Sequence, residues 1–306
     1  MASKVQAGVE SLAGGLIECF AISCIFYGIT IAQANVYFRT CGRDPQWMKW
    51  MATTVIFLET VHTAVLLRKL YFYSVLAIKN PLNLTHVDWT IPAVLILQNV
   101  IEIIVNSFYI HRMWLYSKSI MLTIGMFFIL LSRDATFLFT AIKSATFTTF
   151  GDFDKPGIKG PLIVTHSLAI GLDALLAASM VYHLYRDRTR FRSTRGVISW
   201  MMTYYVNTGV VLAALTLAIL VAYLAAPKSL LYAGFIDIYG KAMANSLFGA
   251  LNSRQVIRNK ISPVTIISTN AYAESNNGST GYGINMNAVQ VEVEVSTETT
   301  KVMDPL

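Results

Sequence analysis

The chain contains few cysteines and few charged residues. Three cysteines in 306 residues are too few for a secreted protein built on disulfides, which needs several pairs. Charged residues make up 13% of the chain, whereas soluble domains contain about 25%. Because hydrophobic residues make up 55%, the chain has too little polar surface for a soluble enzyme. The composition therefore indicates a membrane protein with several spans.

Motifs of the common catalytic and nucleic-acid-binding classes are also absent from the sequence. It has no Gly-x-Ser-x-Gly nucleophile turn and no zinc-finger spacing. Glu59-x-x-His62 matches the spacing of a di-iron helix, but this pattern occurs once and the five histidines are scattered. We therefore expect no enzymatic activity, no metal, no cofactor and no nucleic-acid partner.

Seven apolar stretches are long enough to cross a bilayer, which takes roughly 20 residues. They cover residues 12–38, 50–67, 89–110, 119–142, 161–185, 197–225 and 229–251. Ala32-Gln33-Ala34 resembles a signal-peptidase site, but the apolar run before it is long and contains Glu18, so we interpret this segment as a retained helix. The sequence predicts an all-α fold, a seven-helix transmembrane bundle over residues 1–260, with the lipid bilayer as its first partner.

The distribution of Lys and Arg predicts the orientation of this bundle. The segment Arg186–Arg195 carries five arginines, and strongly basic loops lie in the cytoplasm. This places the N-terminus outside and the C-terminus in the cytoplasm. Arg68 and Lys69 follow the second apolar stretch and are assigned to the outer side. We expect the plasma membrane in preference to internal membranes.

Residues 261–306 differ in character from the rest of the chain. They are rich in Ser, Thr, Asn and Gly and carry mainly acidic charges, which predicts a disordered cytoplasmic tail. This tail and the segment Arg186–Arg195 are the candidate contacts for a cytoplasmic signalling partner. Asn83-Leu84-Thr85 lies on the predicted outer side, and Asn83 is therefore a candidate glycosylation site.

A set of polar and aromatic residues, mostly in the second half of the chain, forms a recognisable pattern. In chain order these are Phe108-Tyr109, Arg112, Trp114, Asp173, Tyr182, Asn207-Thr208-Gly209, Lys241, Asn245-Ser246-Leu247 and Leu251-Asn252-Ser253-Arg254. The pattern resembles the large family of multi-pass membrane proteins of mushroom-forming fungi that carry a C-terminal domain of unknown function. The resemblance is strongest over residues 172–258. It implies a seven-helix membrane architecture and no established activity.

Charged and amide side chains inside the predicted helices are the candidates for function. A charge at the centre of a membrane helix costs about 2.5–3.5 kcal/mol on insertion scales, so such groups usually face the bundle and have partners. We predict an internal polar cavity lined by Glu59, His62, Glu102, Asn106, Asp173, Asn207, Asp237, Lys241 and Asn245. The alternative is a purely structural role, in which these side chains only join helices.

Lys241 is the central residue of this hypothesis. It lies about twelve residues into the seventh stretch, near the middle of the hydrocarbon core. Its ammonium therefore needs a carboxylate or a water-filled cavity. The candidate carboxylates are Asp237, one turn earlier on the same helix, and Glu102 and Asp173 on other helices.

Three function classes fit these features. A receptor-like sensor with a small-molecule ligand is favoured by the seven helices, the outside N-terminus, the basic inner loop and the hydroxyl-rich tail. The third stretch continues into His111-Arg112-Met113, without the acid–arginine–tyrosine motif of the main G-protein-coupled families. A transporter of a small solute, a cation or a proton is the alternative. Asp237-x-x-x-Lys241 is similar to the retinal-lysine spacing of microbial rhodopsins, which makes a retinal-binding protein a distant third.

Overall fold

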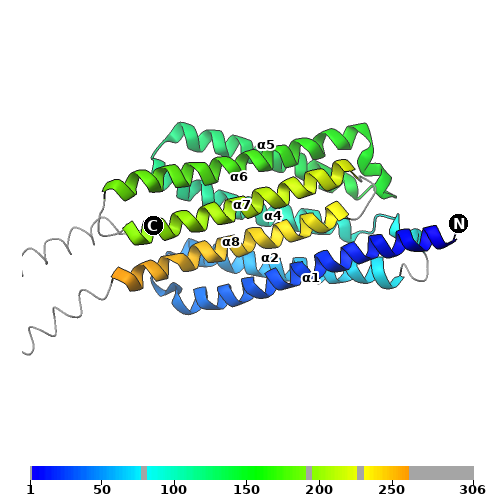
Figure 1. Ribbon diagram of the computed structural model, residues 1–306, viewed down its shortest axis with the longest axis horizontal. Helices are drawn as coiled ribbons and strands as arrows, with labels where there is room; N and C mark the ends of the chain where they lie inside the picture. Colours follow the sequence, from blue (N-terminus) through cyan, green and yellow to red (C-terminus); the bar gives the residue numbers. More distant parts are fainter. Residues whose placement is uncertain (1, 77–80, 191–194, 226–230, 262–306) are drawn as a thin grey trace, which may run out of the picture. The chain divides into compact units, whose positions relative to one another are not determined.

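Seven α-helices make up most of the chain that the structure describes (Figure 1). The computed structural model describes residues 2–76, 81–190, 195–225 and 231–261. The helices are α1 Ala2–Thr40, α2 Gln46–Tyr71, α4 Thr90–Ser117, α5 Ile120–Ser144, α6 Pro156–Arg190, α7 Arg195–Ala225 and α8 Leu231–Ile261. Within these residues there is no strand, only a single antiparallel bridge between His86 and Thr149. The predicted all-α fold is confirmed.

The chain divides into two units, Met1–Arg254 and Gln255–Leu306. The first unit contains the helical bundle. The predicted tail, residues 261–306, lies outside the described residues except for Ile261 at the end of α8.

Each predicted apolar stretch corresponds to one α-helix, but several helices continue beyond the apolar residues. α2 runs through Arg68 and Lys69 to Tyr71. Lys69 is therefore part of the helix, and its side chain is 2% exposed inside the bundle. An ammonium with a buried carboxylate partner allows a helix to continue where the apolar run ends.

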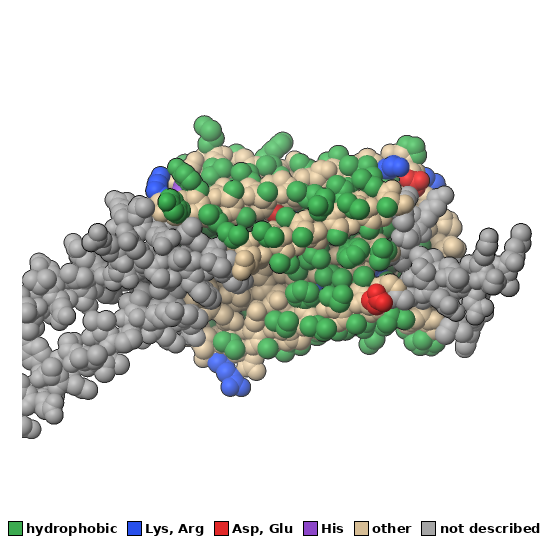
Figure 2. Space-filling view, viewed as in Figure 1, with side chains coloured by type: hydrophobic (Ala, Val, Ile, Leu, Met, Phe, Trp, Pro, Cys, Tyr) green, Lys and Arg blue, Asp and Glu red, His purple; other side chains and the backbone are tan. Residues whose placement is uncertain are grey.

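Six of the described helices, α1, α2, α4, α5, α6 and α7, are long and apolar enough to cross a membrane. Their outward faces carry large hydrophobic side chains, among them Phe57, Ile124, Phe128 and Val210. Figure 2 shows hydrophobic side chains along the length of one face of the bundle, with most of the visible lysines and arginines near its ends. Such a surface suits hydrocarbon rather than water. These helices indicate a multi-pass membrane protein.

Consecutive helices run in opposite directions and pack side by side (Figure 1). Contacts join α1 to α2, α2 to α4, α4 to α5, α5 to α6 and α6 to α7, and α4 also contacts α6. Because the helices alternate in direction, the segments that join them gather at two ends of the bundle. The predicted outer segments, between α2 and α4 and between α5 and α6, lie at the same end.

α8 lies in the interior of the bundle. No residue from Tyr232 to Ser253 is exposed, although this helix is too polar to be among the six apolar ones. Two glycines allow neighbouring helices to approach it closely. A Cβ at Gly234 would lie 2.7 Å from the Cβ of Cys19 in α1, and one at Gly240 would lie 3.0 Å from the Cδ of Gln98 in α4. Small residues at helix contacts are typical of membrane bundles.

The two predicted outer segments form a backbone-paired layer at one end of the bundle. The amide of Val87 donates to the carbonyl of Thr148 at 3.1 Å, and the amide of Phe150 donates to the carbonyl of Thr85 at 3.0 Å. The hydroxyl of Tyr73, just beyond α2, donates to the carbonyl of His86 at 2.8 Å. This end of the bundle is therefore held by hydrogen bonds as well as by helix packing.

Candidate functional site

The interior of the bundle holds many charged and titratable side chains. In the described residues, the acidic, basic and histidine side chains that are less than 10% exposed are Glu59, His62, Lys69, Glu102, Arg112, Arg133, Asp134, His166, Asp173, Asp237 and Lys241. Most of them form two groups that α8 contacts. The α2 group consists of Glu59, His62 and Lys69 of α2 with Asp237 and Lys241 of α8. The Arg133 group consists of Glu102 of α4, Arg133 and Asp134 of α5, and Asp173 of α6.

Lys241 forms an ion pair with Glu59. Its Nζ lies 2.6 Å from Oε2 of Glu59 and also donates to Oγ1 of Thr63 at 2.7 Å and to the carbonyl of Glu59 at 3.2 Å. The ammonium lies 5.1 Å from the centre of the Tyr27 ring, a cation–π distance. The side chain is fully buried, and three oxygens accept from its three N–H groups. A lysine in the apolar core is thus satisfied by α2 alone.

Asp237 pairs with Lys69, not with Lys241. Lys69 Nζ lies 2.5 Å from Oδ2 of Asp237, and the two side chains are 3% and 6% exposed. The expected partners of Lys241 (Asp237, Glu102 and Asp173) are therefore wrong, since its carboxylate is Glu59. The reason is geometric: Asp237 and Lys241 of α8 both face the antiparallel helix α2, where each meets an opposite charge.

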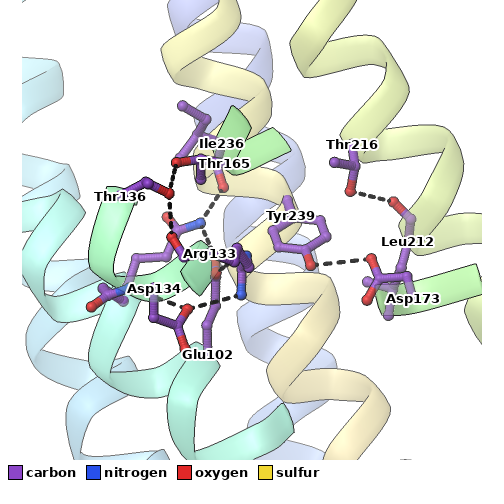
Figure 3. A network of polar contacts seen from close by, with 12 residues as sticks. Glu102, Arg133, Asp134, Thr136, Thr165, Asp173, Leu212, Thr216, Ile236 and Tyr239 are labelled. Carbon is purple, nitrogen blue, oxygen red and sulfur yellow. Dashed lines mark hydrogen bonds and ion pairs between the residues drawn. The ribbon is translucent and has the colours of Figure 1, made fainter. Parts of the chain in front are cut away.

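The Arg133 group joins α4, α5, α6 and α8 (Figure 3). Arg133 pairs with Glu102 across the interface of α4 and α5, and its second nitrogen lies 3.3 Å from Oδ1 of the adjacent Asp134. Gln98 links this group to α8, because its amide nitrogen donates to Glu102 at 2.7 Å and to the carbonyl of Ile236 at 3.0 Å. One guanidinium therefore holds two carboxylates.

Asp173 is the carboxylate of this group without an ion pair. The hydroxyl of Tyr239 in α8 donates to its Oδ2 at 3.2 Å (Figure 3). Among the residues that the structure describes, no Lys or Arg lies within ion-pair distance of Asp173, although Arg133 is close enough to interact electrostatically. Asp173 lines a cavity of about 40 Å³ together with Asn106 of α4 and Thr208 of α7.

His62 is 1% exposed, and neither of its ring nitrogens has a hydrogen-bond partner among the residues that the structure describes. It lies within electrostatic reach of Lys241 and Lys69, that is, of both ion pairs between α2 and α8. Buried polar atoms usually have a hydrogen-bond partner. An imidazole without one can bind a water molecule or take up and release a proton. Oε1 of Glu59 and Oδ1 of Asp237 also have no partner.

The nine predicted cavity residues do not share one space. Glu59, His62, Asp237 and Lys241 lie together in the α2 group, whereas Asp173 and Asn106 line a separate cavity with α7. Glu102 is held by Arg133. The amide of Asn245 is half-buried, and its oxygen has no partner.

Asn207 does not face the interior, and this part of the prediction is wrong. Its side chain is exposed, while Thr208, the next residue of α7, lines the cavity beside Asp173. One residue turns a helix by 100°, so an error of one position is enough to move a side chain from the interior to the surface.

Several interior residues lie outside the predicted set. Arg133 and Asp134 interrupt the fourth apolar stretch, so their charges were visible in the sequence without an indication of their partners. Lys69 was hidden by its place at the end of an apolar run. The sequence did not indicate a role for Tyr239, because its hydroxyl donates to Asp173 on another helix and this contact depends on the fold.

The segments at the predicted outer end contain two further polar sites. Asn83, the candidate glycosylation site, is half-buried, and its amide nitrogen donates to the carbonyl of Leu76 at 3.2 Å. Asp152 accepts from the ammonium of Lys155 at 2.8 Å and from the amides of Thr149 and Thr148 at 3.0 and 2.9 Å. These hydrogen bonds, that of Lys155 first, lower the pKa of Asp152 to about 2.

Comparison with known proteins identifies one region of the chain. In the described residues, no three His, Cys, Asp or Glu side chains are grouped as a metal site would need. No curated protein and no solved structure is detectably similar to the chain. Residues 169–256 match a family model described as a family of unknown function (DUF6534), which confirms the domain of unknown function expected over 172–258. The match contains Asp173, Asp237 and Lys241, so the polar interior described above lies partly in this DUF6534 domain.

Proposed function

We propose that the protein is a seven-pass membrane protein that acts as a receptor-like sensor. α8 supplies the seventh span, because it runs through the bundle beside six apolar helices and its Asp237 and Lys241 are paired inside. The N-terminus is outside and the C-terminus is in the cytoplasm, as the basic segment Arg186–Arg195 favours. The plasma membrane is the favoured location.

One observation carries this proposal: two buried ion pairs, Lys69–Asp237 and Glu59–Lys241, join α2 to α8. A buried ion pair adds little net stability compared with well-packed apolar residues, but breaking one partner costs about 3–5 kcal/mol. Such contacts favour discrete helix arrangements over gradual movement. A protein that switches between two arrangements of α2 and α8 needs contacts of this kind.

A sensor of this kind works by differential binding. A small-molecule ligand that binds one arrangement of α2 and α8 more tightly than another shifts the equilibrium between them. Because α8 leads directly into the C-terminal tail, a shift of α8 reaches the proposed signalling surface, which is the tail and Arg186–Arg195. Most of this surface lies outside the described residues.

The proposal is tested by removing one ion pair completely. Lys241→Met strands the carboxylate of Glu59 and should lower the melting temperature of the detergent-purified protein. Glu59→Met combined with Lys241→Met should restore most of this loss, because neither charge remains. In a strain that lacks the native gene and is screened for lost responses, the stable double variant should fail to restore the response.

Lys159→Met is the matched control, because it breaks a pair with Asp154 whose side chains are 46% and 33% exposed. It should change neither the melting temperature nor the response appreciably. A double variant that is stable and fully responsive would show that the Glu59–Lys241 pair only holds helices together.

The alternative function, transport of a small solute, cation or proton, is favoured by His62. This imidazole has no hydrogen-bond partner and lies near both ion pairs, as a group that passes protons between them would. In proteoliposomes with a pH-sensitive dye inside, a transporter would give proton flux that His62→Asn reduces, whereas a sensor would give none.

The retinal-binding alternative receives less support. Its Schiff base would form at Lys241, whose ammonium is already occupied by Glu59, Thr63 and the ring of Tyr27. Glu59 would be the counterion in that case, not Asp237. Absence of a visible absorption band after retinal is added to the purified protein would remove this alternative.

A further inference from the structure

We infer that the cavity between α4, α6, α7 and α8 binds a small monovalent cation, held by the carboxylate of Asp173. This inference names a ligand class for one part of the proposed internal site. It depends on the membrane bundle but not on any signalling role. Na⁺ is the probe used below.

The first argument is charge. In the Arg133 group three carboxylates (Glu102, Asp134 and Asp173) face a single guanidinium. In the α2 group, by contrast, two ammonium groups match two carboxylates. Glu102 and Asp134 share the guanidinium, so among the described residues Asp173 has the hydroxyl of Tyr239 as its hydrogen-bond donor and no ion-pair partner. An ionised carboxylate in an apolar interior needs a counter-charge.

The second argument is space beside that carboxylate. The cavity that Asp173 lines has a volume of about 40 Å³. A single water needs about 10–15 Å³ measured in this way, so a cation with about one or two waters fits. The remaining walls include Leu176, Met180 and Leu212, so most of the cavity surface is apolar.

The third argument is an unpaired donor in the same wall. Asn106 is 1% exposed, and its amide nitrogen has no hydrogen-bond partner in the described part of the chain. A water in the cavity can accept from this nitrogen and still coordinate a cation at Asp173. The hydroxyl of Thr208 supplies a further oxygen. Asp173, Asn106 and Thr208 thus bring oxygen-bearing side chains to the wall of one cavity, and oxygen is the ligand atom that hard cations prefer.

The composition of the site selects the charge of the ion. Ca²⁺ takes six to eight oxygen ligands, usually from several carboxylates, and Mg²⁺ keeps several waters in a strict octahedron. Asp173 is the one carboxylate among the lining residues described, and no His or Cys is among them. A single negative charge in a cavity of this size fits one monovalent cation.

The test measures the melting temperature of the detergent-purified full chain in NaCl and in N-methyl-D-glucamine chloride at equal ionic strength. Na⁺ should raise the melting temperature in a saturable way, because a ligand that binds the folded state stabilises it. N-methyl-D-glucamine is too large for the cavity and should give no rise. Asp173→Asn should abolish the Na⁺ effect, and Asp152→Asn, which removes a carboxylate from an outer loop, should retain it.

Thr208→Val keeps the test decisive if Asp173→Asn does not fold. It removes one oxygen without changing the shape of the side chain, and it should raise the Na⁺ concentration at half effect about tenfold, or 1.4 kcal/mol. Equal melting temperatures in the two salts would overturn the inference. A Na⁺ effect that persists in Asp173→Asn would also overturn it. So would a melting temperature that rises when the pH is lowered but does not respond to Na⁺. A Na⁺ effect without a cellular response would overturn the sensor and leave the cation site in place.

Discussion

Ion pairs in this protein occur in two environments, buried and partly solvated. The environment determines how much stability is lost when a pair is broken. Those between α2 and α8 are buried on both sides, so losing one partner leaves a charge in an apolar interior. Those of the outer segment are partly solvated: the side chain of Lys155 is 67% exposed and that of Asp152 is 13% exposed. Exposed pairs are typically worth less than about 1 kcal/mol. Asp152 differs because two backbone amides also donate to it.

The stability contributed by Asp152 should depend on pH. Its pKa is lowered from 3.8 to about 2 in the folded protein, so the ionised carboxylate stabilises the fold. This stabilisation is fully present above pH 3.8 and is lost as the pH falls to about 2. Asp152→Asn should therefore lower the melting temperature modestly at pH 7, and the difference from the unmodified protein should disappear near pH 2.

Asp154→Asn provides the comparison in the same loop, because Asp154 accepts from the exposed ammonium of Lys159 at 3.0 Å and, within the described residues, from no backbone amide. It should change the melting temperature less than Asp152→Asn does. A difference for Asp152→Asn that stays constant between pH 7 and pH 2 would show that the carboxylate is not ionised in the way described.

Sequence reasoning identified most of the buried charges but not their partners. Glu59, Asp237 and Lys241 stand out in apolar stretches, whereas the pairing of Lys241 depends on how α2 and α8 are rotated and shifted relative to each other. The sequence of one helix does not determine how that helix is rotated and shifted against another. The same limit explains Asn207 and Thr208, where one residue separates an exposed position from the cavity wall.

Packing between α6 and α7 depends on a glycine. A Cβ built on Gly209 of α7 would lie 2.7 Å from the Cβ of Ala177 in α6, closer than real carbon atoms approach. Gly209→Ala should therefore push these helices apart and destabilise the protein by about 1–3 kcal/mol, the usual range for overpacking. The measurement is the melting temperature of the detergent-purified variant.

Two variants separate packing from helix propensity. Gly171→Ala in α6 adds the same methyl group where no other atom lies within 4 Å, so it should be neutral or slightly stabilising. Ala177→Gly combined with Gly209→Ala should recover much of the loss, because the colliding methyl group is gone. Equal effects of Gly209→Ala and Gly171→Ala would contradict the close packing of α6 on α7.

At the level of helices, the sequence predicted all seven elements, because each contains an apolar stretch of sufficient length. It did not determine where the helices end: α2 passes through two cations to Tyr71. Nor could it predict the place of α8, since a helix with Asp237 and Lys241 is less apolar than the other six. Its lower hydropathy is explained by its interior position, which lets polar side chains meet other helices instead of lipid.

The proposed orientation of the bundle rests on the alternating helix directions together with the distribution of basic residues. Alternation places Thr148, between α5 and α6, and Thr189, near the end of α6, at opposite ends of the bundle. The arginines of the segment Arg186–Arg195 favour the cytoplasm for the end that contains Thr189. Thr148 is then outside, in the exposed part of the paired outer layer.

Cysteine labelling tests this orientation directly. In a background without Cys19, Cys24 and Cys41, single cysteines at positions 148 and 189 should respond oppositely to a membrane-impermeant maleimide in intact cells. Thr148→Cys should react, because Thr148 is exposed in the layer assigned to the outside. Thr189→Cys should react only after the cells are permeabilised, which also controls for its accessibility. The reverse result would turn the bundle over, place the basic segment outside and remove the cytoplasmic signalling surface on which the sensor proposal depends.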